Sequence, residues 1–256
     1  MAFSTKNKKT SLGEDAFIYE KRDEQETEKS KWAKMNRDQK LVHFKTYYLR
    51  PLIIVCLVVA VAGYFFYSDV IRKKNVVYQC AIVNENATEL PVQAFAESFV
   101  ESMNLDSDKN KAVFQLYYTK EELASQVGTS ASTDLTRISS MIYASSMDSM
   151  IAGEEEFQVY LGNRFFVDLT ELLGEEELSR IQDRLYIPES VGEFKNEEKH
   201  PYGVFLQQNE RYGQIFEGGA SIVEKPILGV IFNSENKEAS RQFLYYLFPE
   251  IKNGSQ

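Results

Sequence analysis

The longest apolar run of the chain is PLIIVCLVVAVAGYFFYS, residues 51–68, which lies between Arg50 and Asp69 and contains no charged side chain. A bilayer core about 30 Å thick needs roughly 17–25 apolar residues in a helix, so this run predicts a transmembrane helix over 51–68. Pro51 favours a helix start at that point, because the first helical turn does not use its N–H groups. Fifty residues precede the run and no small-x-small cleavage pattern follows it, which favours an uncleaved anchor over a signal peptide.

The segment before this run, residues 28–50, has apolar positions at helical spacing with basic residues between them. Those apolar positions are Trp32, Met35, Leu41, Phe44 and Tyr48. The pattern predicts a basic amphipathic helix, which we expect to contact lipid headgroups, so that residues 28–68 together contact membrane lipid. A solvated charged helix is the alternative. Residues 1–27 are polar and without periodicity, and they are predicted to form a disordered cytoplasmic tail.

After the apolar run, stretches with strand patterns alternate with stretches of helical spacing. Strands are expected at 76–84, 111–119 and 147–153, and helices at 90–105, at 132–146 and from Glu154 onward. This alternation predicts an α/β domain over 75–256 with a largely parallel sheet flanked by helices. Ser132 or Thr133 is expected to cap the second of these helices.

The second half of this domain is less regular. We expect a polar-rich helix at 175–185, a loop at 186–201, strands at 202–207 and 225–233 joined by a Gly-rich segment, and a final helix at 235–248.

Charge is distributed unevenly along the chain. Residues 1–74 contain 15 Lys and Arg against 9 Asp and Glu, whereas residues 75–256 contain 14 against 29. Seven Lys and Arg lie in 29–50 and three lie in 72–74, which predicts a single-pass protein of the cell membrane with a cytoplasmic N-terminus and an extracytoplasmic C-terminal domain. A domain this acidic is not expected to bind nucleic acid.

Two stretches carry a resemblance to a known family. MDSMIAGEEEFQVYLGNRFFVDLTELL (147–173) and PILGVIFNSENKEASRQFLYYL (226–247) resemble segments of bacterial extracellular solute-binding proteins of the periplasmic type. The matching positions of the first stretch are Asp148, Met150, Ile151, Ala152, Phe157, Tyr160, Phe166, Asp168, Leu169 and Leu173. The resemblance implies a solute-binding-protein-like lobe as the fold of the outer domain, and a role in binding.

The chain departs from that family in three ways. Family members have two lobes with the ligand between them, whereas residues 75–256 suffice for about one lobe. Sugar binders of this kind often stack the ligand on Trp, but the single Trp of this chain is Trp32, before the span. The anchor is also a spanning helix in place of a lipid. The resemblance therefore supports the fold more than solute capture.

Candidate chemistry is sparse. Glu154, Glu155 and Glu156 open a helix, where carboxylates stabilise the positive end of the helix dipole, and adjacent helical residues point about 100° apart and do not converge. His200 is the single histidine of the outer domain, and neither a metal-ligand pattern nor a cofactor motif is present. We expect no catalytic residues, no cofactor and no metal.

The strand ends are the place to expect a ligand. In open parallel sheets ligands bind beyond the carboxyl ends of the strands. The candidate ligand-binding residues at those ends are Asn84, Tyr118, Thr119, Gly153 and Glu154. Each also has a structural interpretation: a turn former for Asn84 and Gly153, packing for Tyr118, and a helix cap for Thr119 and Glu154.

The sequence thus predicts a membrane-anchored extracytoplasmic binding or interaction module, with an envelope protein or a small solute as its partner. Two alternatives remain. One is a hydrolase of the cell envelope that uses acidic residues. The other is a structural or signalling single-pass membrane protein.

Overall fold

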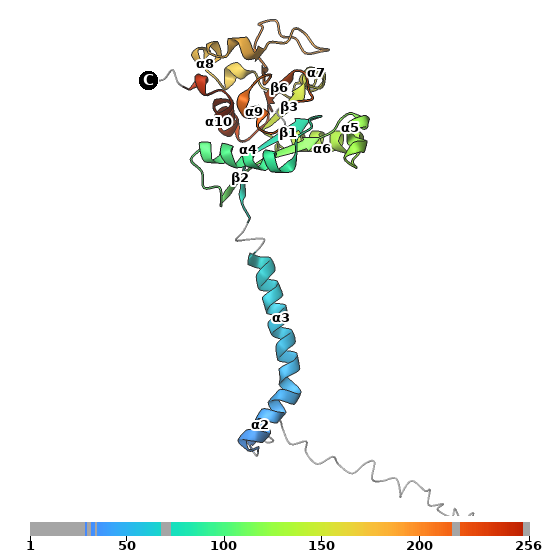
Figure 1. The fold of residues 1–256 in the computed structure, drawn as a ribbon, viewed down its shortest axis with the longest axis vertical. Helices are drawn as coiled ribbons and strands as arrows, with labels where there is room; N and C mark the ends of the chain where they lie inside the picture. The colour runs from blue at the N-terminus through green and yellow to red at the C-terminus, as the bar shows by residue number, and fades with distance from the viewer. Residues whose placement is uncertain (1–28, 30–31, 34, 68–72, 217–220, 253–256) are drawn as a thin grey trace, which may run out of the picture. The chain divides into compact units, whose positions relative to one another are not determined.

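Residues 29, 32–33, 35–67, 73–216 and 221–252 are described by a computed structural model (Figure 1). The chain divides into two compact units, Met1–Ile71 and Arg72–Gln256. The predicted disordered tail, 1–27, lies outside the described residues.

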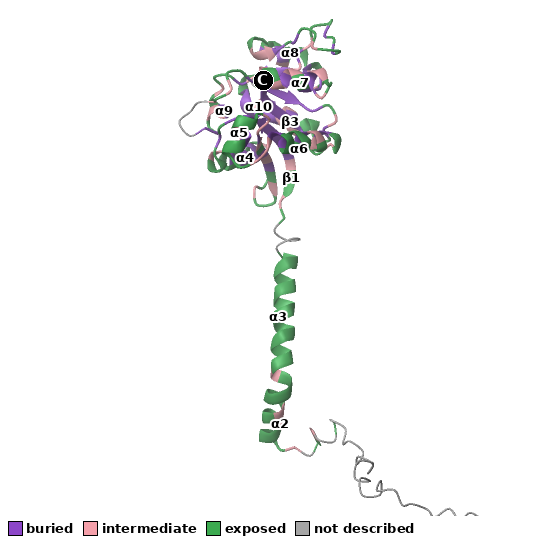
Figure 2. Cartoon of the chain, turned by 90° about the vertical axis from the view of Figure 1, so that its right-hand side faces the viewer, coloured by how far each residue is buried: buried purple, intermediate pink, exposed green. Residues whose placement is uncertain are grey.

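The first unit contains a helix that runs without a break from Arg37 to Phe66. It consists of α2 (Arg37–His43), a π-helical segment η3 (Phe44–Tyr48) and α3 (Leu49–Phe66). None of its residues is buried, and α3 is exposed from Arg50 to Phe66 (Figure 2). Among the described residues it is the one helix with the length and apolar composition needed to cross a membrane.

Two expectations for this unit are wrong in detail. The helix expected over 28–50 is interrupted, because Asn36 forms a capping box with Gln39 and starts a new helix at Arg37. Pro51 does not start the apolar helix but lies inside it. A proline in a helix clashes with the carbonyl four residues earlier, here that of Tyr47, and the π-helical segment directly upstream accommodates such a clash.

The second unit is built on a six-stranded sheet with the order β2-β1-β3-β6-β5-β4. Its strands are β1 (Asn75–Val83), β2 (Asn110–Tyr117), β3 (Ser149–Gly153), β4 (Leu185–Tyr186), β5 (Gly203–Phe205) and β6 (Pro226–Val230). Strand β1 pairs in parallel with β2 and β3, whereas β6, β5 and β4 pair antiparallel. The expectation of a largely parallel sheet is therefore correct for one half of a mixed sheet and wrong for the other.

Helices cover both faces of this sheet. Helices α4 (Glu89–Ser102) and α10 (Lys237–Leu247) pack against one face, while α6 (Ala131–Tyr143) and α7 (Glu154–Gly162) pack against the other. Alternate residues of β1 enter the two cores: Tyr78, Cys80 and Ile82 enter the first, and Ala81 and Val83 enter the second. The purple strands in Figure 2 mark this buried central layer.

Short helices complete the unit, and several differ from expectation. They are α5 (Glu121–Gln126), η5 (Leu169–Glu171), α8 (Glu175–Ser179), η6 (Gln182–Arg184), α9 (Glu210–Gly213) and η7 (Pro249–Ile251). The helix expected at 175–185 is divided into α8 and η6, and α5 and α9 were not expected. Helix α6 is capped by Ser130, whose hydroxyl accepts from the N–H of Thr133, and not by Ser132 or Thr133.

The two stretches that carry the family resemblance meet at Asp148. Its buried carboxylate accepts hydrogen bonds from the Gln79 N–H at 2.7 Å, the Ser234 hydroxyl at 2.6 Å and the Asn236 amide at 3.2 Å. Asp148 thereby links β1, the start of β3 and the turn before α10. Its role in this fold is structural.

Further positions of the resemblance pack the second core. The rings of Phe157 and Phe166 stack with centroids 4.1 Å apart. They lie against Gly229, where an added Cβ would come within 2.6 Å of Phe166, so only glycine fits at that point of β6. These aromatic residues are therefore used for packing.

We predict that Asp148→Asn lowers the free energy of unfolding by about 2 kcal/mol, because an amide cannot accept all of the donors that the buried carboxylate satisfies. Chemical denaturation of the full chain measures the change. Asp183→Asn, at a side chain that is 75% exposed, is the control and should change stability by less than about 0.5 kcal/mol. Equal stability of the two variants would contradict the structural role of Asp148.

Candidate functional site

The carboxyl ends of the three parallel strands meet at one edge of the sheet. The chain proceeds from β1 to β2 on one side and then returns to β3 on the other side, so the strand order reverses between β1 and β3. A reversal of this kind leaves a crevice beyond the strand ends, which is where open α/β sheets bind ligands.

A hollow of about 390 Å³ lies at this edge and is called the strand-end hollow below. It contains three of the predicted site residues, Asn84, Gly153 and Glu154. The remaining lining comes from α5, α7 and the segment before β6: Lys120, Leu123, Glu155, Glu156, Ile222, Val223, Glu224 and Lys225.

Asn84 connects the ends of β1 and β2. Its backbone has a φ of 59°, a left-handed conformation that asparagine tolerates better than most residues. Its side-chain amide donates to the Thr119 hydroxyl at 2.9 Å and to Glu156 at 3.1 Å, and its carbonyl oxygen accepts from the Thr119 N–H at 2.8 Å. The left-handed φ is consistent with the turn interpretation of Asn84, and the side-chain bonds bring Thr119 beside it.

The three glutamates of the α7 start have three different environments. Glu154 pairs with Lys225 at 3.2 Å, and Glu156 pairs with Lys120 at 2.8 Å. The Glu155 side chain is 84% exposed and lies 3.6 Å from Lys120. The hydrogen bond with Glu156 is the main cause that raises the pKa of Lys120. The prediction that the three carboxylates open a helix is confirmed, whereas the prediction that they do not converge is wrong for two of them, because Glu155 and Glu156 both contact Lys120.

Electrostatically, the strand-end hollow is negative. Its lining contains four glutamates, including the exposed Glu224, and two lysines that are both in ion pairs. The apolar Leu123, Ile222 and Val223 also line it. The arrangement suits a group that donates hydrogen bonds or carries positive charge.

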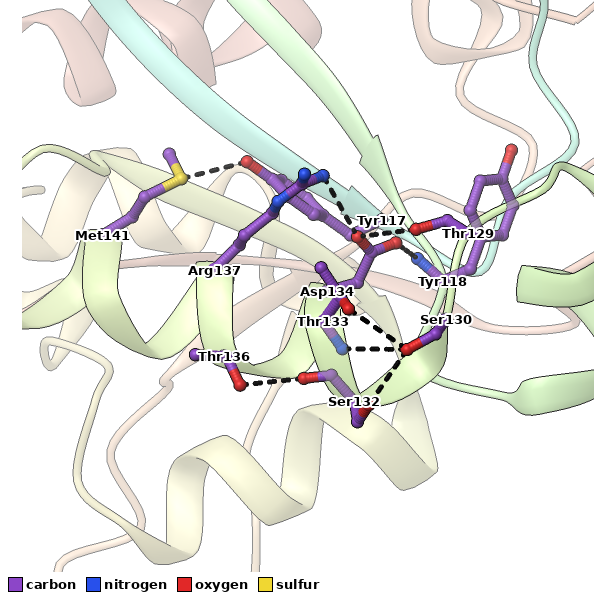
Figure 3. A network of polar contacts seen from close by, with 10 residues as sticks. All are labelled: Tyr117, Tyr118, Thr129, Ser130, Ser132, Thr133, Asp134, Thr136, Arg137 and Met141. Carbon is purple, nitrogen blue, oxygen red and sulfur yellow. Dashed lines mark hydrogen bonds and ion pairs between the residues drawn. The ribbon is translucent and has the colours of Figure 1, made fainter.

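Tyr118 is not among the residues that line the strand-end hollow. Its N–H donates to the buried carboxylate of Asp134 at 2.9 Å, and its ring projects away from that carboxylate (Figure 3). Asp134 also accepts from the Thr129 hydroxyl at 3.5 Å and lies 3.6 Å from Arg137. This network fixes the end of β2 to the start of α6, and partial burial raises the pKa of Tyr118.

A second depression, called the α6–α7 groove below, adjoins the strand-end hollow. It has a volume of about 370 Å³ and shares Lys120, Glu155 and Glu156 with the hollow, while Thr119 lies at its edge. Its walls are more apolar and include Leu135, Val159, Tyr160 and Phe165. Burial, followed by the charge of Glu156, raises the pKa of Tyr160 to about 12.

Glu85 supports one wall of the strand-end hollow and was not expected from the sequence. It follows Asn84, is 1% exposed, and accepts hydrogen bonds from the Tyr212 hydroxyl at 3.0 Å, the Ser221 hydroxyl at 2.5 Å and the Ile222 N–H at 3.2 Å. These bonds position the segment that contributes Ile222 and Val223. Burial raises the pKa of the Glu85 carboxyl.

His200 takes part in a separate interaction outside the strand-end hollow. Its Nδ1 bonds to Asp168, and its Nε2 lies 3.2 Å from Glu198. Asp168 also accepts from the Thr170 N–H and caps η5, so the pair holds the loop before β5 against this helix. Within the described parts of the chain, no three His, Cys, Asp or Glu side chains are grouped so that they could hold a metal ion.

Comparison with known proteins gives no match to a family model, a curated protein or a solved structure. The resemblance to solute-binding proteins therefore stays a prediction.

We predict that Glu85 makes stability depend on pH. A carboxyl whose pKa is raised on folding stabilises the folded state at pH values below its ordinary pKa, and this contribution is lost as the pH rises through the folded value. Glu85→Gln removes this titration, so the stability of the variant relative to wild type should increase from acidic to neutral pH.

Thermal unfolding of the full chain over that pH range tests the prediction. Glu224→Gln, at an exposed glutamate of the same hollow, is the matched control and should follow the wild-type profile. A parallel profile for Glu85→Gln and wild type would contradict the assignment.

Proposed function

We propose that the chain is a membrane-anchored extracytoplasmic binding or interaction module whose outer domain resembles one lobe of a solute-binding protein. The observation that carries this proposal is the strand-end hollow, which lies where the order of the parallel strands reverses. Its volume of about 390 Å³ falls within the range of about 300–1,000 Å³ that is common for small-molecule sites.

The anchor is supported by the exposed apolar helix. Helix α3 has no buried residue and would present its apolar side chains to water unless a membrane or another protein covered them. The excess of Lys and Arg before the helix favours a cytoplasmic N-terminus and an extracytoplasmic domain at the cell membrane.

The lobe assignment is supported by how the two resembling stretches are used. Both contribute a central strand, β3 and β6, and they are joined through Asp148. The residues they share with the family are used for packing and for hydrogen bonds that fix the fold. These residues therefore support the assignment of the fold as a lobe. They do not indicate the ligand, for which the lining of the strand-end hollow is the guide.

The lining of the strand-end hollow restricts the partner. Two lysines are neutralised by glutamates, so the excess negative charge favours a ligand with amino groups or a basic surface of an envelope protein. A small neutral sugar would bury little surface in an open hollow and is expected to bind weakly. Nucleic acid is disfavoured by the same charge.

The hydrolase alternative gains no support from the carboxylates. Glu154 is paired with Lys225, and Glu156 is paired with Lys120. Glycoside cleavage needs two carboxyl groups that face each other across about 5–10 Å, one of them protonated. The carboxylates of the hollow therefore favour binding over catalysis.

We predict that the strand-end hollow, and not the α6–α7 groove, holds the ligand. Calorimetry of the full chain in lipid nanodiscs is carried out with amino acids, oligopeptides and sugars. A ligand with low-micromolar affinity should lose affinity at least about tenfold in Ile222→Trp, which fills the hollow, because displacing a ligand from its contacts costs at least about 1.4 kcal/mol.

Leu135→Trp is the matched control, since Leu135 is a similarly exposed residue that lines the groove instead. Retained affinity in this variant supports the proposal. Loss of affinity in Leu135→Trp alone would move the site to the groove, and absence of binding to all three ligand classes would leave only a protein partner.

We predict that protease added to intact spheroplasts removes the outer domain, 75–256, and spares the N-terminal tail. The physical reason is the excess of Lys and Arg on the N-terminal side of the span, which retains that side in the cytoplasm. Immunoblotting with tags at the two ends measures the outcome. Protection of the outer domain would overturn the proposed compartment.

A further inference from the structure

The chain before the apolar helix folds back on itself. An uninterrupted helix would separate residues 32 and 43 by about 16 Å along its axis. The Trp32 and His43 rings instead lie 6.1 Å apart, edge to face, and the His43 ring lies 4.7 Å from that of Tyr47. The extended backbone of Asn36 provides the turn between them. Trp32, Ala33 and Met35–Tyr48 are called the hook below.

The surface of the hook combines basic and apolar side chains. Arg37, Lys40 and Lys45 contribute positive charge, and Asp38 is the single acidic residue of α2 and η3. The large apolar side chains of Leu41, Val42 and Tyr47 are each 66–68% exposed. The hook has the chemistry of a surface helix that contacts a lipid headgroup layer, with its cations at phosphates and its apolar groups below them.

The length of the helix Arg37–Phe66 places the surface of the hook at the level of the lipid headgroups. The helix Arg37–Phe66 has 30 residues, which is about 45 Å at 1.5 Å per residue. The hydrocarbon core takes up about 30 Å of that length, so roughly ten residues extend beyond it. The apolar run that fills the core begins at Pro51, so the residues outside it at this end include the hook residues Arg37–Tyr48.

The helix axis can turn at this level. Figure 1 shows the axis changing direction between α3 and α2. The π-helical segment η3 lies between these two helices, and Pro51 lies in the first turn of α3. Kinks of helices occur at such sites. A turn there lets α2 lie along the headgroup layer, whereas a straight helix would carry Arg37 beyond it into water.

We propose that the hook is a docking surface for anionic phospholipid headgroups on the side of the membrane where the N-terminus lies. The inference rests on the membrane anchor of the proposed function and adds the class of lipid and the residues that recognise it. Charge complementarity selects the occupant, because a leaflet of acidic lipids attracts basic side chains near its surface. Each basic residue is expected to favour the docked state about fivefold.

The single tryptophan of the chain provides a direct readout. The full chain is reconstituted in nanodiscs of phosphatidylcholine, or of phosphatidylcholine mixed with phosphatidylglycerol, and Trp32 emission and its quenching by brominated lipids are recorded. The acidic mixture should shift the emission to the blue and increase quenching, and added salt should reverse both effects.

A matched pair of variants tests the residues. Lys40→Gln with Lys45→Gln should reduce the ratio of docked to free hook about 25-fold and shift the salt midpoint downward. Lys109→Gln with Lys111→Gln removes the same charge from exposed positions of the outer domain and should leave Trp32 emission unchanged.

Vesicle flotation distinguishes failure of the hook from failure of the membrane anchor. The chain can float with vesicles while Trp32 emission is the same in both lipid mixtures, or while the emission of the Lys40 and Lys45 variant equals that of wild type. Either result would show that the hook does not dock, although the anchor is correct. If the chain does not float, both the anchor and the docking surface are wrong.

Discussion

The carboxylate of Asp148 joins three segments that are far apart in the sequence. It accepts from the backbone of β1, it precedes β3, and it receives the Ser234 and Asn236 side chains before α10. Buried donors that lose such an acceptor carry the cost of desolvation, so this site specifies which strand lies beside which. The parallel half of the sheet and the antiparallel strand β6 meet here, and the strand-end hollow at the opposite end of β3 depends on that arrangement.

Much of the second unit, Arg72–Gln256, could be predicted from residue patterns. The strands β1, β2 and β3 and the helices α4, α6, α7 and α10 follow from their apolar spacing, because each presents a regular face to a core. The alternation of strands and helices predicted the parallel half of the sheet, but the antiparallel direction of β6 could not be predicted, because β6 is buried at every position like the parallel strand β3. The strands expected at 202–207 and 225–233 are found as the shorter β5 and β6, whereas the two-residue β4 was not expected because it is too short to show a period.

The candidate site could be predicted in part, from the positions at which the strands end. Asn84, Gly153 and Glu154 line the strand-end hollow. They could be named in advance, because that prediction needs only the positions at which the strands end. Lys225 and Ile222 come from a segment whose position is set by the buried Glu85, an interaction between residues 137 positions apart. Local sequence does not encode such a contact. Tyr118 was expected because it lies at the carboxyl end of the strand predicted at 111–119, but its N–H donates to Asp134 and its ring projects away from that carboxylate.

The π-helical segment η3 has a consequence for any contact that the long helix makes. A π turn acts like one residue inserted into an α-helix, and one residue corresponds to a rotation of about 100°. A helical wheel drawn across Arg37–Phe66 as a single period therefore assigns α2 to the wrong side relative to α3. Some side chains of α2 and α3 share one stripe on such a wheel, but in the structure they are offset around the helix axis. They therefore cannot form one continuous contact with a neighbouring helix. A neighbouring helix that packs along the stripe of α3 loses contact with that stripe at Tyr48.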